Sequence, residues 1–249
     1  EWRSLGADLA ELDGDLVSLT LVADPFGDHD EAFLNTCFPD CVRPFKQHHV
    51  VDLTESPEDD ISMHHRREVR RALKHVRVEP CAEPLTMLDD WMRLHDALVA
   101  RHAITGIRAF SRASFTQQLQ VPGLVAFRAL HDGEVIGANL VLLNGDVAHG
   151  HLMAQNARGY SLGAAYAMYW SAIQHFSGIA HWYDLGGTPG VWSDDASGLL
   201  RFKQGWTHEQ RTTYLCGRVL NREVYQRLAS ASQPVAPPYF PAYRVGEFR

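Results

Sequence analysis

The chain has 249 residues, 45% of them hydrophobic, and a formal net charge of −7. This length allows one large hydrophobic core or two modest ones. No apolar run reaches the roughly 18 residues of a membrane-spanning helix, and the first residues lack the pattern of a secretory signal. The negative charge argues against a nucleic-acid binder with an overall basic surface. We therefore expect a soluble protein.

The cysteines point to a reducing compartment. Cys37, Cys41, Cys81 and Cys216 form neither a CxxC motif nor the His/Cys spacing of a metal site. This pattern favours free thiols over disulfides or zinc. We therefore predict a cytoplasmic protein that holds no metal.

Two strands and a helix are predicted in the first third of the chain. The segments 15–24 and 48–53 are short, β-branched and closed by turn residues, as strands are. The acidic residues 58–60 are expected at the N-terminus of the next helix, where the helix dipole favours negative charge. Apolar residues recur at helical spacing over 61–76, and RVEP then leaves the helix as a strand.

The opposite face of this helix is basic. It carries Arg66, Arg67, Arg70, Arg71 and Lys74. Such a face could bind the phosphates of coenzyme A, of a nucleotide-linked precursor or of tRNA, but a solvated helix face often has the same composition. We name Arg67 and Arg71 as candidates for substrate binding.

The pattern becomes more regular after residue 84. Helices are predicted around 88–99 and 111–119, the second begun by a capping serine. The segment 124–155 carries Asp-Gly and Asn-Gly pairs between apolar runs, which predicts three successive antiparallel strands. One long helix should follow and end at Gly178.

Shorter elements complete this region. HWYDL is predicted as a strand, GLLRFKQ as a short helix and RTTYLCG as a strand. The tail after residue 228 contains several prolines and should be extended or loosely packed.

This order of elements resembles the GNAT acyltransferase fold. The stretch from residue 48 to about 228 is similar to the branch that contains the FemABX peptidoglycan-bridge aminoacyltransferases and the CelD/BcsL-type acetyltransferases. The matching landmarks are, in order, HHVVDL, RREVRRALK, DGEVIGANLVL, GYSLGAAYAMYWSAI, YDLGG and GLLRFKQGW.

The resemblance implies an α/β (α+β) fold with tandem GNAT-like halves and a mixed, mostly antiparallel sheet flanked by helices. Residues 1–83 would be an incomplete, degenerate first half. Residues 84–228 would be the complete acyltransferase domain, and 229–249 a proline-rich tail.

Acyl transfer to an amine requires a proton acceptor, stabilisation of an oxyanion and a proton for the leaving group. His149 and His151 lie two apart on a predicted strand, so they should face the same side and could accept the proton. Tyrosine hydroxyls could protonate the leaving thiolate; the candidates are Tyr160, Tyr166 and Tyr214. All of these residues also suit ordinary core or surface positions.

A glycine-containing segment, RGYSLG, links a predicted strand to the long helix. Backbone N–H groups at such a junction can hold the pantetheine and phosphates of coenzyme A. The GNAT pyrophosphate loop reads Gln/Arg-x-x-Gly-x-Gly/Ala; Arg158 and Gly163 match it, whereas Ser161 replaces the first glycine. A plain helix start therefore remains an alternative. The predicted cofactor-binding residues are Leu152, Met153, Ala154, Arg158, Gly159, Tyr160, Ser161, Leu162 and Gly163.

The segment from 183 to 206 combines a strand end, glycines and a Phe-Lys pair. Asp184 could accept a hydrogen bond from an amine or anchor the turn, and the glycines after it would let a substrate approach the backbone. The resemblance implies a role for Phe202-Lys203, because the equivalent pair in FemABX enzymes is implicated in transfer; alternatively, Lys203 is solvated. The predicted catalytic residues are Lys203, His149, His151, Asp184 and Tyr214, and the substrate-binding ones are Gly186, Gly187, Arg201, Phe202, Trp206, Arg67 and Arg71.

We expect an N-acyltransferase that uses acetyl-coenzyme A or another acyl-coenzyme A, with an amine on a small molecule or on a cell-wall or polysaccharide precursor as acceptor. One alternative is a FemABX-type enzyme that uses aminoacyl-tRNA, which the acidic chain and small basic patch favour less. Another is a catalytically silent module that binds such a precursor. The oligomeric state stays open.

Overall fold

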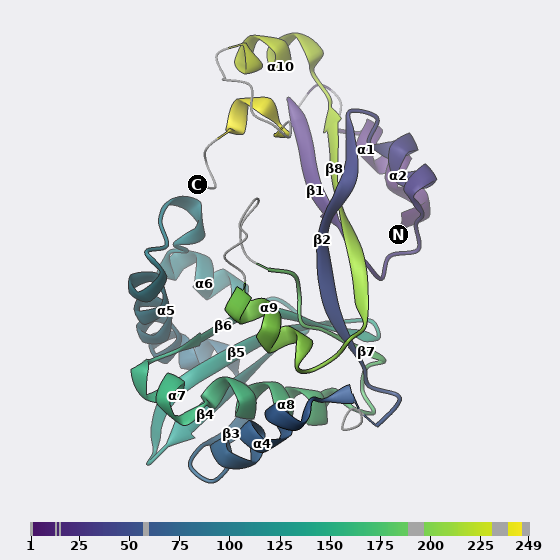
Figure 1. Ribbon diagram of the computed structural model, residues 1–249. Coiled ribbons are helices and arrows are strands. Elements are labelled where there is room, and N and C mark those ends of the chain that lie inside the picture. Colours follow the sequence, from purple (N-terminus) through teal and green to yellow (C-terminus); the bar gives the residue numbers. More distant parts are fainter. Residues whose placement is uncertain are drawn as a thin grey trace. The chain divides into compact units, whose positions relative to one another are not determined.

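The computed structural model describes residues 2–12, 14, 16–56, 60–188, 197–230 and 239–245, which form a mixed α/β architecture (Figure 1). Contacts group the chain into a first unit, residues 1–48 with 211–249, and a second unit, residues 49–210. The strand order is β1-β8-β2 in the first unit and β2-β7-β6-β5-β4-β3 in the second. Most neighbouring strands are antiparallel, which confirms the predicted mixed sheet flanked by helices.

The first unit is built around an antiparallel pair, β1 (Ser18–Ala23) and β8 (Gln210–Val219). Its helices are α1 (Leu5–Ala10), α2 (Glu31–Cys37) and α10 (Arg222–Ala229), with 3-10 turns at Trp2–Ser4 and Ala242–Arg244. Leu34, Phe38 and Cys216 are buried together in its small core. The unit therefore has a core of its own.

The sheet of the second unit consists of β3 (Arg77–Cys81), β4 (Leu124–His131), β5 (Glu134–Asn144), β6 (Val147–Gln155), β7 (Trp182–Asp184) and the end of β2 (Cys41–Asp52). The predicted hairpins β4–β5 and β5–β6 are confirmed. Gly133 and Gly145 have φ of 83° and 59° in the two turns, a backbone region that glycine adopts without strain.

Helices cover both faces of this sheet (Figure 1). On one face α4 (Met63–Ala72) and α8 (Ala164–Phe176) bury residues such as Phe127 and Val141, together with α9 (Ser197–Gln204). On the other, α5 (Leu88–His102) and α6 (Arg112–Gln118) bury the neighbouring Ala126 and Leu140. The 3-10 turns Pro84–Met87 and Gly106–Arg108 flank α5. Alternate strand residues thus point to opposite layers.

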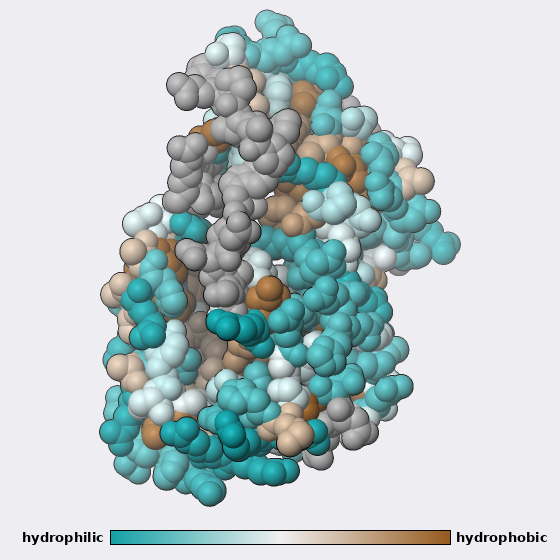
Figure 2. All heavy atoms as spheres, in the orientation of Figure 1, coloured by the Kyte–Doolittle hydropathy of each residue, from teal (hydrophilic) through white to brown (hydrophobic). Residues whose placement is uncertain are grey.

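The outward sides of these helices are polar. On the face drawn in Figure 2, hydrophilic residues predominate and apolar residues are scattered among them. This is the distribution expected of amphipathic helices whose apolar stripes face a sheet.

Two helix predictions are wrong in detail. Helix α4 begins at Met63, capped by the Ser62 hydroxyl, which accepts a hydrogen bond from the His65 N–H. Asp60 therefore precedes the helix, and residues 58 and 59 lie outside the described residues. A serine cap satisfies the first N–H groups directly, so the helix begins without an acidic residue in its first turn.

The long helix expected to end at Gly178 is instead two helices, α7 (Ala157–Leu162) and α8, which ends at Phe176. Gly163 separates them with φ of 69°, and a left-handed residue ends an α-helix because it turns the chain out of the hydrogen-bond ladder. In the tail, residues 231–238 lie outside the described residues. The proposed boundaries at 83 and 228 stay a prediction.

Candidate active site

Strands β6 and β7 separate after a short parallel pairing. The pairs run from Val147 opposite Trp182 to His149 opposite Asp184, whereas β6 continues to Gln155 along β5. In the described part of the chain, the β7-facing edge of residues 150–155 therefore has no strand partner. Gly150 passes close to the end of β7, since a Cβ there would lie 3.1 Å from the Asp184 carbonyl oxygen. An open strand edge can accept an extended ligand through backbone hydrogen bonds.

A histidine and a buried carboxylate lie where the two strands separate. His149 Nδ1 is 3.5 Å from Asp184 Oδ2, and Asp184 is only 3% exposed. The other carboxylate oxygen accepts a hydrogen bond of 2.7 Å from the Gly186 N–H. His149 keeps partial access to solvent. A half-buried imidazole backed by a carboxylate is suited to accept a proton from a substrate.

Two tyrosine hydroxyls share this environment. Burial, and then the charge of Asp184, raises the pKa of Tyr169. Burial also raises the pKa of Tyr183, whose hydroxyl accepts a hydrogen bond of 3.3 Å from Asn139 Nδ2. Both hydroxyls therefore stay protonated at neutral pH. None of these three residues was predicted as part of the site. The one signal in the sequence is Asn139, a polar residue inside the apolar strand β5.

Lys203 lies with the glycine turn that follows Asp184. It is 5% exposed, and its ammonium donates a hydrogen bond of 2.5 Å to the Gly187 carbonyl oxygen. Gly186 has φ of 75°, and a Cβ there would lie 3.5 Å from Lys203 Nζ. Lys203 is therefore buried and not solvated, and its ammonium has the oxygen acceptor that a buried charge needs. It brings together Asp184, both glycines and Lys203.

Aromatic side chains pack α9 and the residues after it against α8. The ring of Tyr169 stacks on Trp206 at 5.6 Å and meets Phe202 edge-on at 5.0 Å. Trp206 is fully buried, whereas Arg201 is exposed on α9. Phe202 and Trp206 therefore contribute packing next to Lys203.

The other predicted catalytic residues have different surroundings. His151 Nε2 lies 2.9 Å from Gln118 Oε1, at a point where the β5–β6 register shifts. Tyr214 belongs to the first unit, where its hydroxyl donates to a Glu31 carboxylate oxygen at 3.5 Å. The catalytic roles of both residues stay predictions.

The segment predicted to hold pyrophosphate is helical and locally bonded. Asn156 caps α7 by accepting a hydrogen bond from the Gly159 N–H at 2.9 Å. Arg158 donates to His131 Nε2 at 2.8 Å, and the Ser161 hydroxyl bonds to the Arg158 carbonyl. Tyr160 lies under the guanidinium of Arg101. Leu162 and Gly163 follow at the junction with α8, while Leu152, Met153 and Ala154 lie on the open part of β6.

The basic face of α4 divides in two. Arg67 and Arg71 both contact Glu68, at 3.3 and 3.6 Å. Arg66, Arg70 and Lys74 recur every fourth residue, and no carboxylate of the described residues lies within ion-pair distance of them. The second set therefore adds three positive charges that no carboxylate of the described residues offsets, while Arg67 and Arg71 share the single carboxylate of Glu68.

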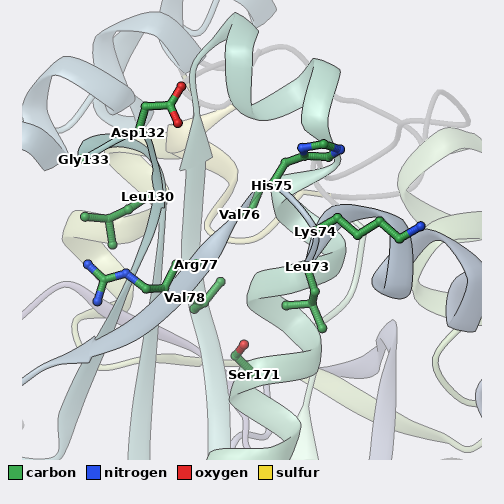
Figure 3. A pocket seen from close by; sticks show the side chains of 10 residues that line it. All are labelled: Leu73, Lys74, His75, Val76, Arg77, Val78, Leu130, Asp132, Gly133 and Ser171. Atoms are coloured by element: carbon green, nitrogen blue, oxygen red, sulfur yellow. The ribbon is translucent and has the colours of Figure 1, made fainter.

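A surface cavity of about 490 Å³ lies beyond the end of α4 (Figure 3). Its walls come from the α4–β3 connection, the β4–β5 turn and α8, with Lys74, His75, Arg77, Asp132 and Ser171 among the lining residues. Arg77 is paired with Glu79 at 2.6 Å. The cavity contains none of the predicted site residues.

The described residues contain no group of three or more His, Cys, Asp or Glu side chains that could hold a metal ion. None of their helices is both long and apolar enough to cross a membrane.

Comparisons with known proteins agree with this arrangement. A family model described as "Acetyltransferase (GNAT) domain" matches residues 63–204. A crystal structure of FemX is similar with a TM-score of 0.65 and 14% identity, over 91% of this chain and 80% of that one. The search of curated proteins found no match.

Two further structures share the fold. One is the C-terminal domain (DUF2156) of a putative lysylphosphatidylglycerol synthetase from Agrobacterium fabrum, with a TM-score of 0.60, 16% identity and coverage of 75% of this chain. The other is L-PGS from Bacillus licheniformis, with a TM-score of 0.54, 15% identity and 78% coverage. This chain spans 65% of the length of each.

Proposed function

Since the chain belongs to the GNAT acetyltransferase domain family and is a FemABX-like N-acyltransferase, we propose that it transfers an acyl group from acyl-coenzyme A to an amine. The acceptor would be a small molecule or a cell-wall or polysaccharide precursor, and the reaction would take place in the cytoplasm. The family match spans more than half of the chain and includes β7 and α9.

The open edge of β6 is the observation that favours acyl-coenzyme A as the donor. A pantetheine arm contains two amide groups, and these can pair with backbone groups along Leu152–Ala154 as an added strand would. The inner end of that edge is Gly150, beside the Asp184 backbone. A thioester held on this edge would thus have its carbonyl directed toward the residues at the end of β7.

The residues at this end of β7 suit the chemistry. His149 accepts a proton from the amine, helped by the Asp184 carboxylate at 3.5 Å. As the new C–N bond forms, the Lys203 ammonium stabilises the charge that develops on the carbonyl oxygen. When the C–S bond breaks, the imidazolium of His149 returns its proton to the thiolate, so that charge and protons balance. No covalent acyl-enzyme is required.

Aminoacyl-tRNA is the second candidate donor. It is supported by Arg66, Arg70 and Lys74, which form a line of basic residues without an ion-pair partner in the part of the chain that the structure describes. Phosphate backbones bind such lines by releasing counterions, so affinity falls steeply with salt. One structure that shares the fold is also named as a putative lysylphosphatidylglycerol synthetase, and lysyl is an aminoacyl group.

Titration calorimetry distinguishes the donors. We expect acetyl-coenzyme A to bind with an affinity in the micromolar to millimolar range, and uncharged or charged tRNA to bind weakly. No heat with acetyl-coenzyme A at millimolar concentration would eliminate the favoured donor. Tight, strongly salt-dependent binding of aminoacyl-tRNA would replace it with the second candidate. Binding of acetyl-coenzyme A without any acyl transfer to amines would indicate a catalytically silent module that binds a precursor.

A further inference from the structure

The last turn of α9, which carries Lys203, is capped by a side chain from α4. The final carbonyl groups of a helix have no partner inside it. Here the Arg201 carbonyl accepts a hydrogen bond from the Gly205 N–H at 3.2 Å, and the Lys203 carbonyl accepts one from the Trp206 N–H at 3.0 Å. The Phe202 carbonyl lies between these two, and it accepts a hydrogen bond of 2.8 Å from His65 Nε2.

The hydrogen bonds of His65 define its tautomer. A carbonyl oxygen only accepts, so Nε2 must carry the hydrogen, and Nδ1 is left to accept from the Ser62 hydroxyl at 3.2 Å. Ser62 adds a second connection, since its N–H donates to the Gly205 carbonyl at 2.9 Å. The start of α4 is therefore bonded to the end of α9 at two points.

The imidazole ring is enclosed on all sides. His65 is 4% exposed, and the rings of Tyr166, Trp206 and Phe202 lie 5.0, 5.1 and 5.3 Å from it. A Cβ at position 205 would overlap the imidazole, so only glycine lets the chain pass here. The ring can thus move little without moving the end of α9.

The titratable and charged groups that face His65 are His64 and Glu68 on α4 and Tyr166 on α8. From α9 the ring meets the Phe202 carbonyl, and Lys203 is the next residue along the chain. Burial lowers the pKa of His65, more than the Phe202 carbonyl raises it. The ring is therefore neutral at neutral pH and serves as a hydrogen-bond donor without adding a second cation near Lys203.

We propose that His65 is a positioning residue, which holds the end of α9 through the Phe202 carbonyl and thereby directs the Lys203 ammonium toward the turn after Asp184. The role in catalysis rests on the proposed function of Lys203. The role in positioning does not, because it concerns where the ammonium points in the absence of any substrate.

The chain offers a direct test, because Lys46, Lys74 and Lys203 are its three lysines. Trace acetylation with acetic anhydride, followed by mass spectrometry of peptides, gives the reactivity of each amine. Exposed Lys74 provides the reference, and Lys46, in the first unit, reports general loosening. In the unaltered chain Lys203 should react far more slowly than Lys74.

Two variants separate the hydrogen bond from the packing. His65→Gln can place an amide N–H where Nε2 lies, whereas His65→Phe fills the same space and leaves the Phe202 carbonyl without a donor. We expect His65→Phe to raise the Lys203-to-Lys74 ratio about tenfold, the equivalent of one lost hydrogen bond, and His65→Gln to change it less than about twofold. Gly205→Ala, which displaces the ring, should act in the same direction as His65→Phe.

An unchanged ratio in His65→Phe, or an equal rise at Lys46, would overturn the proposal. Transfer kinetics with acetyl-coenzyme A supply the second readout: His65→Phe should lower kcat more than it raises KM, and His65→Gln should restore kcat. If acetyl-coenzyme A does not bind but the labelling changes as expected, the proposed function fails and the positioning role stands. If acyl transfer is measurable and the labelling ratio does not change in His65→Phe, the positioning role fails and the proposed function stands.

Discussion

Two glycine-containing segments of the second unit look equally promising in the sequence, but the structure uses them differently. In α7, Gly159 packs where a Cβ would lie 2.5 Å from the Ile136 carbonyl oxygen, and Arg158 is bonded to a histidine. After β7, the glycine turn is joined to a buried carboxylate and a buried lysine. Burial of ionisable groups costs free energy, and this is why we propose the second segment, rather than α7, as the catalytic one.

We expect the largest loss of activity from replacing Lys203, in the segment after β7. We expect Lys203→Met to lower kcat for acyl transfer by about 10²–10³-fold, because the charge that stabilises the developing oxyanion is removed. KM for acetyl-coenzyme A should change little. Steady-state kinetics with Lys46→Met as the matched control measure this, since Lys46 is a half-buried lysine of the first unit. A Lys203→Met enzyme with normal kcat would leave the lysine a purely structural role.

Asp184 should have the next largest effect. Asp184→Asn preserves the shape of the side chain but removes the charge 3.5 Å from His149, so kcat should fall by about 10–10²-fold, less than the loss of a general base itself. The exposed Asp96, replaced in the same way, is the control. If the two variants retained equal activity, the carboxylate would only anchor the turn through the Gly186 N–H.

One glycine from each segment, Gly159 in α7 and Gly186 after β7, tests whether the two segments differ in function. Gly159→Ala should destabilise the fold by about 1–3 kcal/mol through overpacking, with the kcat of the folded fraction unchanged. Gly186→Ala should cost only about 1–2 kcal/mol for its left-handed backbone, but should lower kcat because the new Cβ lies beside Lys203 Nζ. Urea unfolding and kinetics on the same samples separate the two effects. Equal loss of activity in both variants would mean that α7 contributes to the site.

Local patterns explain how much of the fold could be predicted. The β4–β5 and β5–β6 hairpins follow from turn residues that need left-handed backbone, and the Ser111 cap of α6 from a side chain three residues away from its partner. The break at Gly163 was missed because a single glycine inside a helical pattern does not reveal its φ angle.

The site depended on contacts that no local pattern contains. A role for Lys203 near the glycine turn after Asp184 was proposed from a family resemblance, whereas the capping of Phe202 by His65 joins residues 137 positions apart. The helical spacing over 61–76 gave no sign of this role for His65. Tyr169 and Tyr183 were likewise indistinguishable from core residues, because burial and charge become visible only when strands and helices are placed in space.

The smallest expected effect is a pH dependence of stability. The pKa of His65 is lowered in the folded chain, so below the unfolded value of about 6.5 the unfolded chain binds a proton that the folded chain does not. Stability should therefore fall as the pH drops below that value, by at most about 1.4 kcal/mol for each pH unit. His95 and His151 also have a lowered pKa, so the unaltered chain alone cannot assign the slope. His65→Gln removes one titrating group and leaves the others. The difference in pH dependence between the unaltered chain and this variant, measured by urea unfolding at neutral and mildly acidic pH, therefore belongs to His65. Parallel curves would mean that His65 is protonated as readily in the folded chain as in the unfolded one, and that its burial does not keep it neutral.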